Sequence, residues 1–382
     1  MFKRELFSSD HELFRDMVRR FVAEKITPFH AEWEKKGQLD REAWLAAGEL
    51  GLLCPTVPEE YGGPGADFLY STVVLEEFAR AGAMGPGFTL HSDIVAPYLL
   101  HYGSEALKTR WLPRMVSGEV IGAIAMTEPG AGSDLQSIQT KAIRDGDEYV
   151  ISGQKVFITN GQMSDIIIVA CKTNPDERSK GTSLILVEAD RAGFSRGRNL
   201  EKIGWKAQDT SELFFDKVRV PVSNLIGVEG NGFIQLMEQL PQERLLQSIR
   251  ATSVIEAALE WTVEYVNERH AFGRPIAKFQ NTRFKLADVK SQSVMMRVFV
   301  DRCIAMHLQG ELDSIDAAMS KLLASEMMCE LLDECLQLFG GYGYMWEYPI
   351  ARAWADARMA RIAGGTCEIM REIIGRNLCE GK

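Results

Sequence analysis

The sequence has 382 residues, of which 46% are hydrophobic and 25% are charged. This composition is ordinary for a globular protein and excludes a disordered or fibrous chain, and the length predicts two or three domains. The 43 Lys and Arg residues are outnumbered by 53 Asp and Glu residues, so the net charge is −10. A chain this acidic, without a basic run, is a poor nucleic-acid binder.

The residue types that hold metals or disulfides are sparse. The seven cysteines are widely spaced without a CxxC pair, and the six histidines form no HExxH pair, so we expect neither a disulfide framework nor a metal site. The longest apolar runs are far shorter than a membrane span, and the first residues lack the apolar segment of a signal peptide. We therefore expect an intracellular protein without a membrane span, cytoplasmic in a bacterium or in the mitochondrial matrix as a processed eukaryotic chain.

Residues 1–119 are expected to form an N-terminal helical domain. A capping-box pattern at residues 9–12 precedes apolar residues at helical spacing, and Pro28 is expected to end that helix. Asp40 could cap a short helix after it. Further helical stretches are expected near residues 67–81, 91–101 and 104–117.

Residues 120–229 change to a period of two with clustered β-branched residues, which predicts a central β domain. Asp145 and Gly146 separate two such stretches and predict a hairpin turn. Since no helical segment fits between the strands, parallel crossovers are not expected, and the pattern favours a small antiparallel sheet or barrel. Further strands are expected at residues 166–170, 182–187 and 211–215.

Residues 230–382 return to helical periodicity in long stretches, which predicts a C-terminal antiparallel helix bundle. The expected helices cover residues 232–269, 278–309 and 314–338, and a shorter set follows. The predicted fold class is therefore α+β and multi-domain, with helices first, then a β domain, then a bundle.

Four short segments could carry chemistry, and each has a plainer explanation. Residues 125–134 combine glycines with hydroxyl side chains that let a ligand approach the backbone, but such residues are common in turns, and the segment matches neither nucleotide-binding glycine pattern. Residues 337–344 and 362–366 could be glycine-terminated helix ends. Residues 240–244 hold a Glu-Arg pair that could be a solvated or structural ion pair.

Taken together, in this order and at this spacing, the segments resemble the acyl-CoA dehydrogenase family of flavoproteins over nearly the whole chain. Residues 126–134 resemble its first signature, residues 337–356 its second, and residues 157–160 a strand beside the flavin. Arg269 with residues 272–273 resembles a segment that reaches the FAD of a neighbouring subunit. The resemblance implies a C-terminal four-helix bundle, bound FAD, an acyl-CoA substrate, an electron-transferring flavoprotein as electron acceptor, and a homotetramer.

Site residues are carried over from this resemblance position by position. Phe157 could instead pack in the core, and Arg269 could be a helix-end cation. At Glu368 the family more often has an amide, and a carboxylate beside a pyrophosphate is unfavourable unless it points away. The residues expected to contact acyl-CoA are Ser133, Arg244, Gly364 and Gly365. The residues expected to contact FAD are Met126, Thr127, Gly132, Ser133, Phe157, Thr159, Arg269, Phe272, Gln280, Thr366 and Glu368, with Gln337, Gly340 and Gly341 from another subunit.

The catalytic base is where this sequence departs from the family pattern. Most members carry a glutamate directly before the Gly-Thr of the third segment, where this chain has Gly364, which has no side chain to act as a base. The long-chain and isovaleryl-type branch of the family places its glutamate on a C-terminal helix, directly before an arginine. Glu243 and Arg244 occupy that position here, so the resemblance implies Glu243 as the catalytic base. An inactive enzyme is the alternative.

The implied reaction removes two hydrogens across Cα–Cβ of an acyl-CoA thioester and gives the trans-2-enoyl-CoA. Glu243 would take the α-proton while flavin N5 takes the β-hydrogen as hydride. A dry cleft would raise the pKa of the carboxyl and make it a better base, while hydrogen bonds polarise the thioester carbonyl. Medium to long straight acyl chains are expected. The alternatives are a short branched isovaleryl-like group, a bulky terpenoid or steroid-type group, or a flavoprotein that binds acyl-CoA without turnover.

Overall fold

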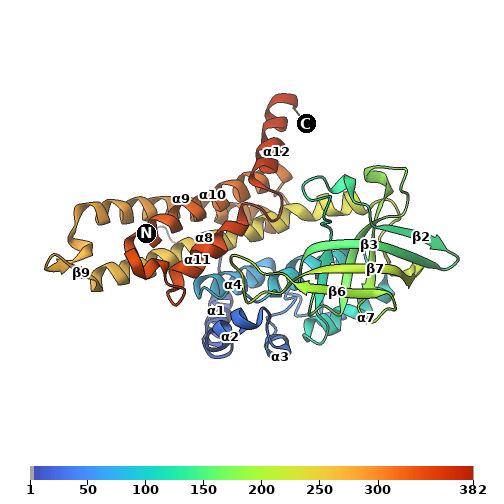
Figure 1. The fold of residues 1–382 in the computed structure, drawn as a ribbon, viewed down its shortest axis with the longest axis horizontal. Coiled ribbons are helices and arrows are strands. Elements are labelled where there is room, and N and C mark those ends of the chain that lie inside the picture. Colours follow the sequence, from blue (N-terminus) through green and yellow to red (C-terminus); the bar gives the residue numbers. More distant parts are fainter. Residues whose placement is uncertain (1–3, 382) are drawn as a thin grey trace.

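The computed structural model describes residues 4–381. Helices form the N-terminal part, a sheet forms the middle part, and long helices form the C-terminal part, so the predicted three-part fold is confirmed (Figure 1). The sheet lies at one end of the long axis and the free end of the bundle at the other, with the N-terminal helices packed below the junction.

The first helical run does not stop where the sequence predicts. Helix α1 (Ser9–Phe21) passes through a π-helical turn, η1 (Val22–Ile26), into α2 (Thr27–Lys36). Pro28 lies in the first turn of α2, where its missing N–H is tolerated, so the prediction that it ends the helix is wrong. The cap also lies one residue earlier than predicted: the backbone N–H of Ser8 donates to Nδ1 of His11 at 3.0 Å.

The remaining N-terminal helices pack around α4 (Phe68–Arg80), which contacts both α1 and the bundle. Asp40 does precede a short helix, α3 (Arg41–Glu49), but its carboxylate accepts the indole N–H of Trp33 instead of capping that helix. The stretch predicted at 91–101 begins as a second π-helical turn, η3 (His91–Val95). It continues as α6 (Ala96–Tyr102), and α7 (Glu105–Val116) follows.

The central sheet is mixed. The predicted hairpin is present, because β2 (Lys141–Asp145) and β3 (Glu148–Thr159) pair antiparallel with Asp145 opposite Glu148. Strand β1 (Gly122–Ala125), however, runs parallel to β4 (Ile166–Lys172), which corrects the purely antiparallel expectation. The crossover that a parallel pair requires is supplied here by the segment carrying the β2–β3 hairpin instead of by a helix. The other strands are β5 (Thr182–Glu188), β6 (Phe194–Asn199), β7 (Thr210–Pro221) and β8 (Leu225–Ile226). Across the whole sheet the strand order is β6-β7-β3-β2-β4-β5-β8, with β1 added beside β4.

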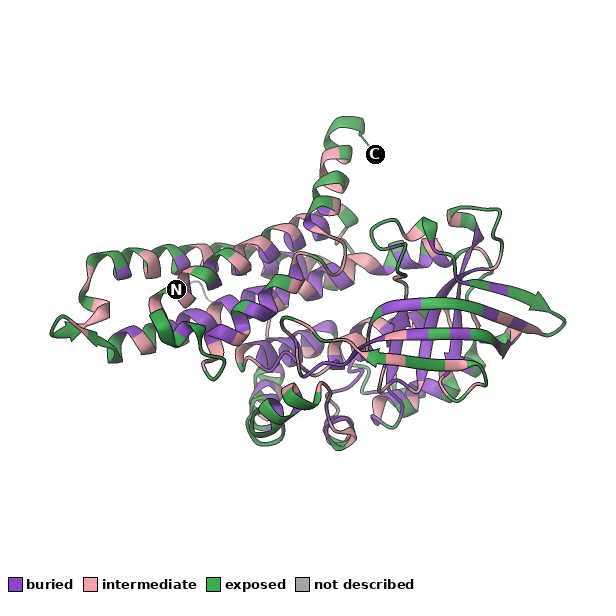
Figure 2. Cartoon of the chain, viewed as in Figure 1, coloured by how far each residue is buried: buried purple, intermediate pink, exposed green. Residues whose placement is uncertain are grey.

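The C-terminal part is built on α8 (Gly232–Glu268), which packs against α4, α9 (Gln280–Leu308), α10 (Ser314–Phe339) and α11 (Pro349–Ala360). Figure 2 shows that burial follows the facing sides of these helices and the inner positions of the sheet. The last helix, α12 (Cys367–Glu380), packs on α10 at its base and projects away from the body (Figure 1).

A buried ion cluster ties the N-terminal helices to the bundle. The Glu76 carboxylate on α4 accepts from Arg4 at 2.8 Å, from Arg15 at 2.9 Å and from Arg297 of α9 at 2.9 Å. Burial opposes ionisation of Glu76, but the surrounding guanidiniums outweigh it and lower the pKa to about 2. Among the helices of residues 4–381, none combines the length and the apolar character that crossing a membrane demands.

Candidate functional site

The loop after β1 is fixed to β3 by a buried ion pair. Lys155 donates to the backbone carbonyl of Met126 at 2.8 Å and to the carboxylate of Glu128 at 2.9 Å. The same carboxylate accepts the backbone N–H groups of Gln139 at 2.6 Å and Thr140 at 2.9 Å. These bonds hold the main chain of the first signature in place. Sequence reasoning did not select either charged residue.

Phe157 lies where β3 loses regular pairing with β7. The register shifts between Lys155 and Ile158, and Phe157 takes a left-handed backbone with φ of 62°. Its side chain is 66% exposed, so the interpretation of Phe157 as a core residue is wrong. A large aromatic ring held in a strained conformation and left in solvent is more typical of a ligand contact than of packing.

The glycines of the first signature leave an open backbone. Gly132 and Ser133 are exposed, and a Cβ added at Gly130 or Gly132 would meet no atom within 4 Å. Close internal packing therefore does not explain these glycines. Met126, Thr127 and Thr159 are partly exposed nearby in the same loop and strand, so the structure places the predicted flavin-side residues on one part of the β domain.

The remaining cofactor residues lie mostly at the free end of the bundle. Arg269, Gln337, Gly340 and Gly341 line one hollow of ≈ 520 Å³, where the Arg269 guanidinium is 5.6 Å from the centre of the Tyr342 ring. The β9–β10 hairpin (His270–Ala271 and Arg274–Pro275) presents Phe272, which is 94% exposed, and Gln280 begins α9 beside it.

The two sets of residues are far apart in one chain. The hairpin that follows Arg269 lies at one extremity of the molecule and the β domain lies at the other (Figure 1). A single subunit therefore does not bring Arg269 and Gln337 together with Met126 and Phe157.

Glu243 lies on α8 and is buried, with 6% of its surface exposed. The hydroxyl of Tyr98 on α6 donates to Oε1 of Glu243 at 3.0 Å. Burial raises the pKa of Glu243 to about 7, although the Tyr98 bond and the charge of Arg244 both oppose the rise. Arg244 is also buried and donates to the carbonyl of Ser314, so the pair is not a solvated surface ion pair.

Gly364 faces α8 one helical turn from Glu243. A Cβ at Gly364 would lie 3.7 Å from Cγ of Gln247, and its φ of +67° is one that side-chain-bearing residues rarely adopt. The carbonyl of the neighbouring Gly365 accepts from the buried ammonium of Lys321 at 2.6 Å. This places the loop that lacks the usual glutamate beside the helix that carries Glu243.

The residues after this loop start α12. The hydroxyl of Thr366 accepts the backbone N–H of Ile369 at 3.3 Å as the helix cap. Glu368 is exposed in the first turn, and its own backbone N–H and the Thr366 hydroxyl lower its pKa. Thr366 and Glu368 belong neither to the residues on the β domain nor to those at the free end of the bundle. Their contact with a cofactor therefore stays a prediction.

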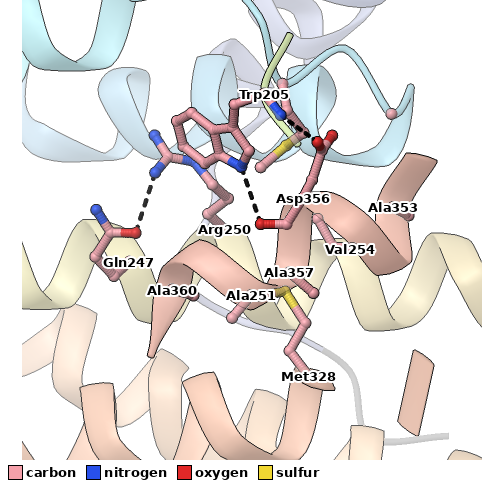
Figure 3. Close-up of a pocket in the computed structure, with 12 residues that line it drawn as sticks. Trp205, Gln247, Arg250, Ala251, Val254, Met328, Ala353, Asp356, Ala357 and Ala360 are labelled. Carbon is pink, nitrogen blue, oxygen red and sulfur yellow. Dashed lines mark hydrogen bonds between the residues drawn. The ribbon is translucent and has the colours of Figure 1, made fainter. Parts of the chain in front are cut away.

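A narrow apolar cavity of ≈ 10 Å³ lies further along the same side of α8 (Figure 3). Arg250 donates to the side-chain oxygen of Gln247 at 3.2 Å and lies over the Trp205 ring at 4.7 Å. The indole N–H of Trp205 donates to the carbonyl of Asp356 at 3.1 Å. Burial raises the pKa of the Asp356 carboxyl to about 7. The apolar wall consists of Met84, Ala251, Val254, Met328, Ala353, Ala357 and Ala360.

The three parts of the chain match three family descriptions in sequence order. Residues 8–119 match the acyl-CoA dehydrogenase N-terminal domain, residues 123–218 its middle domain, and residues 230–379 its C-terminal domain. The chain belongs to the acyl-CoA dehydrogenase family. The predicted family, the enzyme class and the dependence on FAD are confirmed for this acyl-CoA dehydrogenase.

Individual relatives agree over almost the full length. The chain is 51% identical to the mitochondrial long-chain specific acyl-CoA dehydrogenase of Sus scrofa, covering 99% of this chain and 89% of that protein. It is 37% identical to the mitochondrial isovaleryl-CoA dehydrogenase of Oryza sativa subsp. japonica, covering 98% and 92%. The crystal structure of acyl-CoA dehydrogenase from Geobacillus kaustophilus superposes with a TM-score of 0.97 at 47% identity, covering 99% of this chain and 100% of that chain.

The residues on the β domain and at the bundle end fit an FAD group. The open backbone at Gly130 and Gly132 admits close approach, and the exposed Phe157 ring offers a flat apolar surface. At the bundle end, Arg269 supplies positive charge beside a hollow lined by glycines, which suits a pyrophosphate. Among the described residues, no cluster of His, Cys, Asp and Glu has the arrangement of a metal site.

Proposed function

We propose that this acyl-CoA dehydrogenase converts medium to long straight-chain acyl-CoA to the trans-2-enoyl-CoA, with Glu243 as the base that takes the α-proton. The observation that carries the proposal is the buried Glu243 carboxyl, whose pKa burial raises to about 7. A carboxylate with a pKa near the working pH is a better proton acceptor than an exposed one, yet is still partly ionised there. Gly364, at the usual position of the base, leaves that side of the pocket without a competing carboxylate.

The chain's own residues would bind the substrate and hold the proton. Arg244 and the Gly364–Gly365 backbone would flank the thioester together with Ser133, and hydrogen bonds to the thioester carbonyl would stabilise the charge that develops there. Bound FAD supplies the acceptor for the β-hydrogen. The residues that would hold it are Met126, Thr127, Gly132, Ser133, Phe157, Thr159, Arg269, Phe272, Gln280, Gln337, Gly340, Gly341, Thr366 and Glu368.

Each cofactor site would be completed by a second subunit. Arg269 and Gln337 lie at the end of the molecule opposite Met126 and Phe157, so one FAD can meet both groups only if two chains contribute (Figure 1). The proposed assembly is a homotetramer. Although Arg269 is remote from the flavin-side loop of its own chain, Arg269→Glu is expected to lower FAD content and to leave the fold of the sheet unchanged. Flavin absorbance measures the first effect and circular dichroism the second.

The proposal for the acyl group rests on relatives and on α8. The two identities of 51% and 37% favour the long-chain specific name over the isovaleryl name. The alanine-lined wall beyond Gln247 would accept an apolar chain if Met84 and Met328, both flexible, moved aside. An electron-transferring flavoprotein is the proposed electron acceptor. The proposed location is the mitochondrial matrix in a eukaryote or the cytoplasm in a bacterium.

Anaerobic mixing with palmitoyl-CoA tests the reaction. Turnover bleaches the absorbance band of the oxidised flavin, whereas binding alone only perturbs it. In a separate aerobic assay, an oxidase would consume oxygen without an acceptor protein. We expect Glu243→Gln to retain FAD and ligand binding and to lose flavin reduction by about three orders of magnitude or more, because the neutral amide cannot accept the proton. Near-normal reduction in this variant would show that Glu243 is not the base. A series of acyl-CoA chain lengths and isovaleryl-CoA tests the substrate class.

A further inference from the structure

The continuous segment formed by η3 and α6 is joined at both its ends to α8 by side-chain hydrogen bonds, at α8 residues shortly before the proposed base. At one end, Gln242 donates to the backbone carbonyl of Asp93 at 2.6 Å. At the other end, the Tyr102 hydroxyl donates to Glu238 at 2.7 Å. The η3–α6 segment therefore runs along α8 beside the position from which Glu243 emerges.

Tyr98 lies between these two anchor points. It is fully buried, and its hydroxyl donates to Oε1 of Glu243 at 3.0 Å. Burial and the adjacent Glu243 charge raise the pKa of Tyr98 well above its ordinary value, so the phenol stays protonated and remains a donor over the working pH range. A buried neutral donor of this kind fixes the orientation of a carboxylate without neutralising its charge.

We propose that Tyr98 is a positioning residue for the catalytic base, holding one carboxylate oxygen of Glu243 so that the other faces the α-carbon of the acyl-CoA. The inference rests on the proposed function of Glu243. Tyr98 touches neither the reacting carbon nor the flavin in this scheme and acts through Glu243 alone.

The charged groups around Glu243 do not perform this role. Arg244, from the same helix, directs a guanidinium N–H to the carbonyl of Ser314. Lys321 of α10 donates to Gly365. Asp93 of η3 meets α8 through its carbonyl, and its carboxyl interacts with Arg250.

The hydrogen bond has a predictable effect on titration. Because Tyr98 donates to the ionised carboxylate, it favours ionisation and opposes the rise in the pKa of Glu243. Removing the hydroxyl raises that pKa further, and the acid limb of the proton-abstraction profile moves to higher pH. A residue that only filled space would lower activity or stability and leave the limb in place.

Tyr98→Phe tests the inference in the holoenzyme, because it removes the hydroxyl and keeps the ring. The flavin is reduced beforehand with dithionite, and incorporation of α-deuterium into palmitoyl-CoA in D₂O is followed by mass spectrometry across about pH 5–9, so that proton abstraction alone is observed. We expect the limiting exchange rate to fall at least about tenfold and the acid limb to rise by about one pH unit. Tyr102→Phe is the matched control, since it removes a hydroxyl one turn away that serves Glu238; its profile should match the parent enzyme.

Three outcomes separate this inference from the proposed function. An unshifted limb in Tyr98→Phe overturns the role of Tyr98. Exchange that persists in Glu243→Gln overturns the base itself, whatever Tyr98 does. If Tyr98→Phe loses FAD or fails to fold, 3-fluorotyrosine at position 98 replaces it: this stronger donor should move the limb to lower pH, and an unchanged limb there also counts against the inference.

Discussion

Two buried glutamates show how the same side chain serves two different purposes in this molecule. Glu128, in the loop after β1, accepts from the Lys155 ammonium and from two backbone N–H groups. Burial opposes its ionisation, but these partners outweigh burial and lower its pKa. Glu243, on α8, has the hydroxyl of Tyr98 as its donor, and burial raises its pKa to about 7.

Both residues are 6% exposed, but the Glu243 carboxyl lies deeper than that of Glu128, so the opposite pKa shifts reflect both the partners and the desolvation of the two groups. A fully paired carboxylate is a structural anchor and a poor base, since its lone pairs are occupied and its proton affinity is low. A desolvated carboxylate with one weakly acidic donor has free lone pairs and a high proton affinity. The first holds the loop after β1 in place, and the second is suited to accept a proton.

Breaking the anchor should produce the largest effect. Lys155→Met leaves the Glu128 carboxylate buried without its counter-charge, and removing one partner of a buried pair costs about 3–5 kcal/mol. We expect the free energy of unfolding to fall by that amount and FAD to be lost on gel filtration. Denaturant unfolding and flavin absorbance measure the two effects.

An exposed lysine on the neighbouring strand gives the control. Lys141→Met on β2 removes the same charge from a solvated site, so it should change the unfolding free energy by less than about 0.5 kcal/mol. If the two variants lose the same unfolding free energy, Lys155 contributes no more than an exposed lysine does and does not anchor the loop.

Ionisation of Glu243 is expected to destabilise the folded state, whereas ionisation of Glu128 stabilises it. The pKa of Glu243 rises from its ordinary 4.5 to about 7, so the folded state holds the proton more tightly than the unfolded state. The contribution of Glu243 to stability is therefore greatest below pH 4.5, declines as pH rises toward 7 and stays lower above it. At about 1.4 kcal/mol for each pKa unit, the loss amounts to about 3 kcal/mol.

Glu243→Gln should abolish this decline, because the amide does not ionise and can still accept from Tyr98. The variant should then be more stable than the parent at alkaline pH, by up to about 3 kcal/mol, and little different in acid. Glu128→Gln should show the opposite pattern and be least stable relative to the parent above pH 4.5, where the parent gains from its ionised pair. Thermal unfolding of the holoenzymes at several pH values distinguishes the two variants. Parallel curves would show that Glu128 and Glu243 do not differ in how ionisation affects stability.

The sequence supports the large-scale prediction because long amphipathic periods and clustered β-branched residues determine where helices and strands form. The three long helices were predicted to within two residues of their observed ends. Local geometry was predicted less well. Pro28 is accommodated in the first turn of α2 after a π-helical turn, and β1 pairs in parallel through a crossover that contains a hairpin. Both depend on tertiary contacts that periodicity does not record.

The site residues divide in the same way. Those in the glycine-rich segments were predicted through the family resemblance, and so was Glu243, which occupies the position that the long-chain and isovaleryl-type branch uses. Lys155 and Tyr98 were not, because a lone lysine in a strand or tyrosine in a helix carries no pattern in the sequence. Their significance depends on which carboxylate each one meets. The pairs Lys155–Glu128 and Tyr98–Glu243 form only because β3 packs on the loop after β1 and α6 packs on α8.

The smallest effect expected is that of a single methyl group at the empty position. Gly364→Ala adds strain at a φ of +67°, which costs about 1–2 kcal/mol, and places a Cβ 3.7 Å from Gln247 without a clash. Gly146→Ala is the matched control, since it has a φ of +64° in the exposed β2–β3 turn, where a Cβ meets nothing within 4 Å. We expect equal losses of unfolding free energy in the two variants, but a fall of about tenfold in kcat/KM for palmitoyl-CoA in Gly364→Ala alone, because one methyl group would fill space that the acyl-CoA uses. If both variants keep the parent kcat/KM, the space beside Gln247 is not part of the substrate site, and the absence of a side chain at Gly364 then has no bearing on how Glu243 reaches the α-carbon.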